Sequence, residues 1–203
     1  MSHDPHIEGV ARLALVLMLG LGCASTLVQR TSTDEVIDLS GRWNDTDSRL
    51  VAEEMIRDVA GRSWAVDHAA RTGQKPTVIV GVIRNMSHEH LNTQTFVKDL
   101  EREWVNSGRV RVVAASDERG SVRAEREDQA THARLETARS MGRETGADYM
   151  LLGQINTILD SADGETVRYY QIELELIDVE TNEKAWIGQK KVKKLVSRKR
   201  FGF

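Results

Sequence analysis

The chain has 203 residues, of which 40% are hydrophobic and 29% charged, a composition typical of a folded globular domain rather than of a disordered or collagen-like chain. A formal net charge of −3 gives no overall electrostatic reason to bind nucleic acid. The single cysteine, Cys23, excludes an intrachain disulfide and a zinc site built from several cysteines.

The N-terminal segment has the pattern of an exported lipoprotein. The uncharged run LALVLMLGLG at 13–22 is too short to span a bilayer, which needs about 20 apolar residues, but it matches the apolar core of a signal peptide. GLGC at 20–23 looks like a bacterial lipobox, in which the cysteine is acylated and becomes the mature N-terminus. The alternative is a buried apolar helix with a buried cysteine. We therefore expect a signal peptide over 1–22, a lipidated Cys23 with a flexible linker over 23–40, and one domain over 41–203.

The domain is predicted to begin with two helices and a strand. N-cap candidates precede an apolar helix face formed by Val51, Met55 and Val59, and a short second helix is expected over 63–73. A β-branched run at 77–83 predicts a strand buried on both faces. The polar residues that follow, at 84–88, are expected to form a loop.

The next helix is expected to start at Thr93 and to end at Gly108, a glycine placed where a C′ residue belongs. A short strand at 110–114 and a solvated, densely charged helix at 117–129 follow. A further helix is predicted to carry three apolar residues and to end at Gly146; these residues are Leu135, Ala138 and Met141.

The last part of the chain has the pattern of a β-meander. Apolar and polar residues alternate in its middle segment, which is typical of a half-buried strand, and Asp163-Gly164 is a strong turn signal. The three strands are expected over 149–158, 170–176 and 185–196, with turns at 160–165 and 181–183. The order of elements predicts a single α/β domain, with a mixed β-sheet flanked by helices and a C-terminal β-meander.

Motifs for catalysis and cofactor binding are missing from the sequence. It contains no phosphate-binding loop, no dinucleotide-binding glycine pattern and no nucleophile elbow. His88-Glu89-His90 offers two imidazoles, but a metal site needs further ligands, so solvated histidines are favoured. Glu173 and Glu175, like Glu53-Glu54, are interpreted as exposed charge. We therefore predict no catalytic, cofactor or metal site and no small-molecule substrate.

Basic residues gather near the C-terminus. They are Lys190, Lys191, Lys193, Lys194, Arg198, Lys199 and Arg200. A lysine-rich edge strand resists aggregation, and pairing with Glu173 and Glu175 is a further structural role. The functional alternatives are contact with anionic lipid headgroups or with an acidic protein face. Nucleic acid is not expected, because only Phe201 and Phe203 could stack on bases.

Four segments of the sequence resemble the LpoB family, namely GRWNDTDS at 41–48, PTVIVGVIRN at 76–85, GADY at 146–149 and LIDVETNEKAWIG at 176–188. The similarity covers residues 41–195. The resemblance implies a compact α/β domain, similar to the N-terminal domain of TolB, without catalysis. It also implies an outer-membrane lipoprotein that binds a non-catalytic docking domain of a class A penicillin-binding protein. Such binding would stimulate glycan polymerisation and peptide cross-linking.

This interpretation gives candidate residues for partner binding. They are the expected loop Arg84, Asn85 and Met86, and the strand edge with Trp186, Lys190 and Lys191. A core position is the alternative for Trp186. Because Ala24 rather than Asp follows the cysteine, we expect the periplasmic face of the outer membrane. The competing function is an envelope scaffold or secretion-associated lipoprotein, similar to CsgG, which would form ring oligomers; an envelope hydrolase is a third hypothesis.

Overall fold

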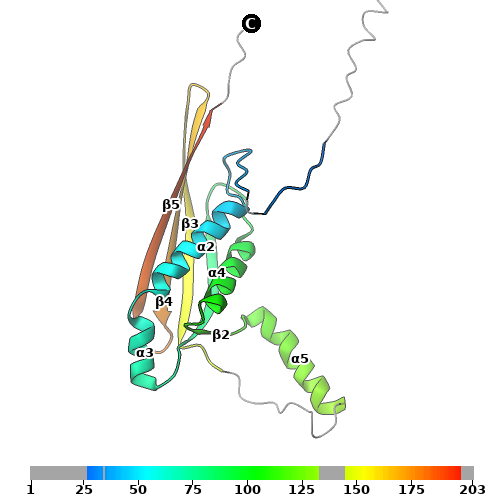
Figure 1. The fold of residues 1–203 in the computed structure, drawn as a ribbon, viewed down its shortest axis with the longest axis vertical. Coiled ribbons are helices and arrows are strands. Elements are labelled where there is room, and N and C mark those ends of the chain that lie inside the picture. Colours follow the sequence, from blue (N-terminus) through cyan, green and yellow to red (C-terminus); the bar gives the residue numbers. More distant parts are fainter. Residues whose placement is uncertain (1–26, 34, 133–144, 198–203) are drawn as a thin grey trace, which may run out of the picture. The chain divides into compact units, whose positions relative to one another are not determined.

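The structure is a computed structural model that describes residues 27–33, 35–132 and 145–197 (Figure 1). The predicted signal peptide, Cys23, the predicted helix around Leu135 to Met141 and the basic residues Arg198 to Arg200 lie outside these residues. The chain divides into two compact units, residues 1–35 and 36–203, and the second holds all the helices and strands discussed below. Within the described residues, no helix is both long enough and apolar enough to span a membrane.

The second unit has helices and strands in the predicted order. The described helices are α2 (Asp45–Ala60), α3 (Trp64–Thr72), α4 (Thr93–Ser107) and α5 (Ser116–His132). The strands are β1 (Thr77–Met86), β2 (Arg111–Val112), β3 (Tyr149–Ala162), β4 (Glu165–Asp178) and β5 (Lys184–Ser197).

The strands form one mixed sheet in the order β2-β1-β3-β4-β5. β1 is parallel to both of its neighbours, whereas β3, β4 and β5 run antiparallel to one another as a meander (Figure 1). Parallel strands need a long crossover, and α4 supplies the one between β1 and β2. The predicted fold class, an α/β domain with a mixed sheet and a C-terminal meander, is therefore confirmed.

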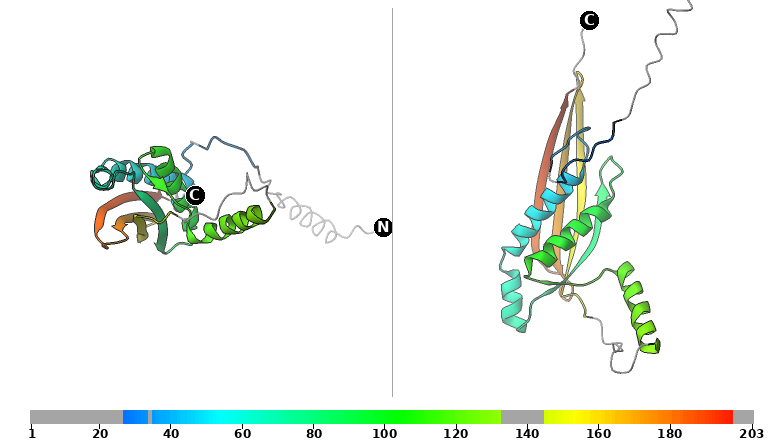
Figure 2. Two further views of the ribbon diagram at one scale, coloured as in Figure 1. Left: turned by 90° about the horizontal axis from the view of Figure 1, so that it is seen from below. Right: turned by 45° about the vertical axis from the view of Figure 1, so that its right-hand side comes forward.

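Helices α2 and α4 lie side by side on one face of the sheet (Figures 1 and 2). α2 begins with a capping box in which the Asn44 side chain and Asp47 satisfy each other's backbone N–H groups. α4 ends at Gly108, whose φ of 62° is in the left-handed region that glycine adopts without cost. The predicted apolar helix faces and the C′ glycine are thus confirmed, whereas the N-cap residues, Asn44 and Asn92, precede the residues expected to cap these helices.

The core lies between these helices and the sheet. Its largest fully buried side chains include Trp104 and Phe96 of α4 and Tyr170 of β4. Trp64 meets Trp104 edge-on at 5.9 Å between ring centroids, and its indole N–H donates to the Val59 carbonyl at 2.7 Å. Edge-on aromatic pairs add about 0.5–1.5 kcal/mol beyond their buried area. Trp64 also meets Tyr149 of β3 edge-on at 5.0 Å, so the aromatic cluster joins the helical layer to the sheet.

Two sequence-based predictions about β1 are wrong. The strand continues through Met86, so Arg84, Asn85 and Met86 are strand residues rather than a loop. Moreover, the strand is not buried on both faces, because Val82 is 68% exposed. The physical reason is a register shift against β3 between Val80 and Ile83, which turns both of these side chains to the helices and Val82 away from them.

The β3–β4 hairpin is also longer than predicted. Its turn contains only Asp163 and Gly164, both with positive φ, at 51° and 85°. Such two-residue turns follow the natural twist of paired strands, so the ladder continues to the turn itself, with Ala162 opposite Glu165. The polar composition of residues 160–165 concealed this extension, because the end of the hairpin is exposed on both sides.

Two polar clusters fasten the residues before α2 to the sheet. Lys194 of β5 donates to Asp38 at 2.6 Å, to Asp47 at 2.5 Å and to the Arg42 carbonyl at 3.2 Å. Burial alone would lower the pKa of Lys194, but the hydrogen bonds to the two carboxylates outweigh burial and raise it. In the second cluster, Glu89 accepts hydrogen bonds from the backbone N–H of Trp43 and from the Tyr170 hydroxyl, and it pairs with Arg168 of β4.

Candidate functional site

The sheet has an open face, defined as the face opposite α2 and α4. Side chains alternate along each strand, so buried residues of β4 such as Leu174 face the helices, while their neighbours Glu173 and Glu175 belong to the open face. The first turn of α5 borders this face beside β1, and α5 itself has no buried residue. The open face is therefore the large sheet surface that the described helices leave uncovered.

Exposed apolar side chains are spread over the open face. They come from three strands, β1, β3 and β5, and are 59–68% exposed: Val82, Met86, Ile158, Ile187 and Leu195. Isolated apolar side chains on a surface are ordinary, but several on one continuous sheet face mark an interaction surface. Partly buried side chains such as Leu152 lie between them.

A polar network crosses the middle of this face. Strand register places Arg84, Gln154, Glu173 and Gln189 in one row across β1, β3, β4 and β5. The Glu173 carboxylate accepts hydrogen bonds from Gln154 at 2.9 Å and, from its own strand, Gln171 at 2.5 Å. These bonds, with a weaker one from Gln189, lower the pKa of Glu173 against the opposing effect of burial.

The structure brings three of the predicted partner-binding residues together. Arg84 lies in the Glu173 row, and Met86 and Lys191 lie at the two ends of the next row, with Asn156 and Gln171 between them. Within the described part of the chain, neither Arg84 nor Lys191 is paired with a carboxylate, and both side chains are exposed. The sequence pattern could not reveal this grouping, because it depends on register across four strands.

The other three candidates belong to the helix-covered side. Asn85 donates to the Glu89 carbonyl at 2.7 Å, and Lys190 pairs with Glu54 of α2. Trp186 is 6% exposed, and its indole N–H donates to Asp58 at 2.9 Å. These contacts give the three side chains structural roles within the fold.

The four described lysines of the basic cluster near the C-terminus are divided between the two sides of β5. Lys190 and Lys194 pair with acidic groups on the helix side. Lys191 and Lys193 are exposed on the open face. Neither of them is paired with Glu173 or Glu175 in this part of the structure: Gln189 and Ile187 lie opposite those glutamates, and Lys184 binds Glu175 at 2.7 Å.

The segment His88-Glu89-His90 serves the fold. His88 is exposed and its ring contacts the Thr157 hydroxyl at 3.0 Å, while the Glu89 side chain is only 9% exposed. Among the described residues, no group of three or more His, Cys, Asp or Glu lies together as a metal site would require.

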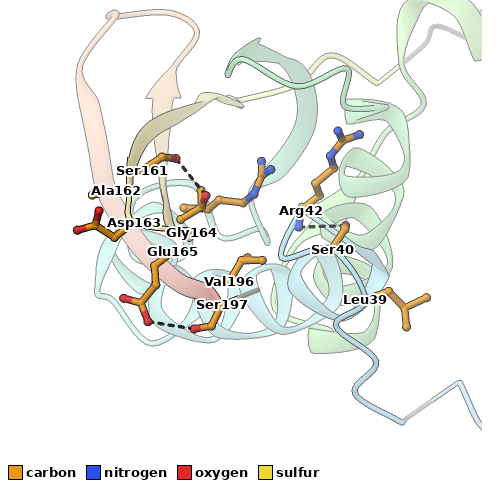
Figure 3. A pocket seen from close by; sticks show the side chains of 12 residues that line it. Leu39, Ser40, Arg42, Ser161, Ala162, Asp163, Gly164, Glu165, Val196 and Ser197 are labelled. Carbon is orange, nitrogen blue, oxygen red and sulfur yellow. Dashed lines mark hydrogen bonds between the residues drawn. The ribbon is translucent and has the colours of Figure 1, made fainter. Parts of the chain in front are cut away.

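A pocket of about 800 Å³ lies at the end of the β3–β4 hairpin, between residues 39–42 and the end of β5 (Figure 3). Its polar groups are largely engaged with one another: Ser161 bonds to Thr166 at 3.0 Å and Ser197 to Glu165 at 3.4 Å. Arg168, which also lines it, is paired with Glu89. These groups stabilise the hairpin end, and the open face remains the stronger candidate site.

These features define a class of protein, a single α/β domain with helices on one face of a five-stranded mixed sheet and a mixed polar and apolar surface on the other. The chain belongs to the LpoB family, because the family model described as "Peptidoglycan-synthase activator LpoB" matches residues 47–192. The resemblance found in the sequence is thereby confirmed.

The solved structures to which this chain is similar include two that are named LpoB. The C-terminal domain of LpoB from Escherichia coli aligns with a TM-score of 0.43 and 15% identity, over 72% of this chain and 98% of that one. The NMR structure of E. coli LpoB gives 0.42 and 16%, over 86% and 84%. Lipoprotein GNA1162 from Neisseria meningitidis gives 0.38 and 13%, over 62% and 88%. Among the curated protein sequences compared, none matches.

Proposed function

We propose that this chain is a non-enzymatic lipoprotein, anchored at the periplasmic face of the outer membrane, that binds and activates a bifunctional class A penicillin-binding protein. The observation that carries the proposal is the match to the family of peptidoglycan-synthase activators over residues 47–192. The open face supports it, because unpaired cations and exposed apolar side chains on one sheet face suit a protein partner.

The anchor limits where this activator works. If Cys23 is acylated, more than one acyl chain makes a stable membrane anchor. The 12 residues from Ala24 to Glu35, which precede the second compact unit in the sequence, then span at most roughly 43 Å when fully extended, at about 3.3–3.6 Å per residue. The partner's docking domain must therefore reach to within that distance of the membrane.

The decisive experiment measures the rate of glycan polymerisation and of peptide cross-linking by the organism's class A synthases, with and without the full chain in detergent. We expect the chain alone to be inactive and the synthase to become faster in its presence. Charge reversal on the open face, Arg84→Glu or Lys191→Glu, should weaken the stimulation. Arg109→Glu, an exposed cation away from that face, is the matched control. No stimulation of any class A synthase would overturn the proposal.

Two further measurements address the anchor and the competing scaffold function. Mass spectrometry of the mature N-terminus should find an acylated cysteine at position 23, and density-gradient fractionation should place the protein with the outer membrane. Light scattering should find no ring-sized oligomer; a ring would favour the scaffold function over the activator.

A further inference from the structure

The groups around Glu173 stabilise the negative charge of its carboxylate without neutralising it. Its three hydrogen-bond donors are neutral amides from three strands, Gln154 of β3, Gln171 of β4 and Gln189 of β5, at 2.9, 2.5 and 3.3 Å. These bonds favour the ionised form and hold the pKa of the carboxyl below its ordinary value. The side chain is partly exposed, so the negative charge is presented at the surface in a fixed orientation.

No basic side chain in the described part of the chain forms an ion pair with Glu173. Lys184 cannot pair with Glu173 because it bonds to Glu175. Arg84 is in the same row as Glu173, but Gln154 lies between them. Two other carboxylates of the domain are paired with lysine, Glu175 with Lys184 and Glu54 with Lys190. The glutamines therefore fix the Glu173 oxygens while leaving their charge to an external cation.

The surroundings have the shape and charge to receive one side chain. A depression of about 240 Å³ is lined by Glu173 and Glu175 together with Val82, Leu152 and Arg84. Outside it, Lys191 and Lys193 add positive charge along β5. The open face therefore has a negative centre, apolar neighbours and a positive margin.

We propose that Glu173 receives an arginine or lysine side chain of a protein partner that docks on the open face, with carboxylates of that partner meeting Arg84, Lys191 and Lys193. This charge pattern complements the face at its centre and at its margin. The inference rests on the proposed function only for the identity of the partner. It adds the anchor residue and the chemistry that the partner must present.

The first test uses the soluble ectodomain of the class A synthase and the full chain in detergent. A hydrogen bond to a charged group contributes about 1.5–3 kcal/mol, so Glu173→Gln should weaken binding by about 10- to 100-fold. Glu173→Lys should weaken it further. Glu180→Gln and Glu180→Lys, in the exposed turn after β4, are the matched controls and should stay within twofold of the wild type. Wild-type affinity in both Glu173 variants would overturn the inference.

The second test measures cation binding at Glu173 in the absence of the synthase. The side-chain amide NMR signals of Gln154, Gln171 and Gln189 are followed during titration with N-acetyl-arginine amide, with N-acetyl-glutamine amide as the neutral control. We expect arginine-specific shifts that disappear in Glu173→Gln. If no such shifts occur, Glu173 is not a cation-binding residue and the inference is wrong. If the shifts occur but the wild-type protein does not bind the synthase, the proposed function is wrong instead. Thermal unfolding of each variant checks that the fold is intact.

Discussion

The carboxylate of Glu89 joins three segments that are far apart in the sequence. It pairs with the Arg168 guanidinium, accepts the Tyr170 hydroxyl at 2.9 Å and accepts the backbone N–H of Trp43 at 3.4 Å. The Glu89 and Arg168 side chains are 9% and 19% exposed. Replacing Glu89 with alanine therefore leaves a guanidinium that water solvates poorly, and whose Nε already has no partner among the described residues.

The size of the effect follows from what is left unpaired. Removing one partner of a buried ion pair costs about 3–5 kcal/mol, so Glu89→Ala should lower the free energy of unfolding by that amount. Tyr170→Phe removes a single hydrogen bond and should cost about 1 kcal/mol. The double variant Glu89→Ala/Arg168→Met leaves neither charge unpaired. Its loss of unfolding free energy should therefore be clearly smaller than the sum of the losses in Glu89→Ala and Arg168→Met.

Urea unfolding of the full chain, followed by tryptophan fluorescence, is measured for the wild type, Glu89→Ala, Arg168→Met, the double variant and Tyr170→Phe. The coupling between positions 89 and 168 is the quantity of interest, since it isolates the ion pair from lost packing. If the two single losses add to within about 0.5 kcal/mol, or if Glu89→Ala costs less than 1 kcal/mol, the pair is not the buried contact described above.

The remaining predictions concern stability. Lys194→Met leaves the Asp47 carboxylate without its lysine partner and should lower the free energy of unfolding by about 2–4 kcal/mol. Lys193→Met, one position along on the open face, should change that free energy by no more than about 0.5 kcal/mol. Because the pKa of Lys194 is raised in the folded state, its stabilising effect is complete below the ordinary lysine pKa of 10.5 and is lost as the pH rises through the folded pKa. The destabilisation caused by Lys194→Met should therefore be constant from neutral pH to about pH 9. Gly153→Ala should destabilise strongly, since its Cβ would lie 2.4 Å from the Glu173 carbonyl oxygen. Gly120→Ala, in α5 with open space around it, should instead stabilise by about 0.5–1 kcal/mol; equal effects of the two glycine changes in thermal unfolding would contradict this.

Local sequence signals predicted most of the elements. The α2 face with Val51 and Met55, the left-handed Gly108 and the turn at Asp163-Gly164 all depend on neighbours within a few residues. The alternation along β4 depends only on the pleat of a strand. These features are local, and the structure confirms them.

The positions of the predicted site residues were harder to predict, because the sheet face on which a side chain lies depends on residues that are distant in the sequence. A single register shift against β3 decides that Arg84 and Met86 lie on the open face and Asn85 does not. Lys190, expected at an exposed edge, instead pairs with Glu54 of α2, and Trp186 takes the core position that was its alternative, with Asp58 as its hydrogen-bond partner. Sequence alone could not supply these contacts, since they join residues more than 120 positions apart.

The sequence by itself determined the order of elements, the mixed α/β class, the membership of a family of synthase activators and the expectation of a lipidated cysteine at position 23. Only the tertiary structure decided which groups share a surface. It buried Glu89 between β4 and the residues before α2, and it surrounded Glu173 with glutamines from three strands. The physical reason is that helix caps and strand alternation are short-range, whereas sheet register and the choice of the helix-covered face arise from packing across the whole domain.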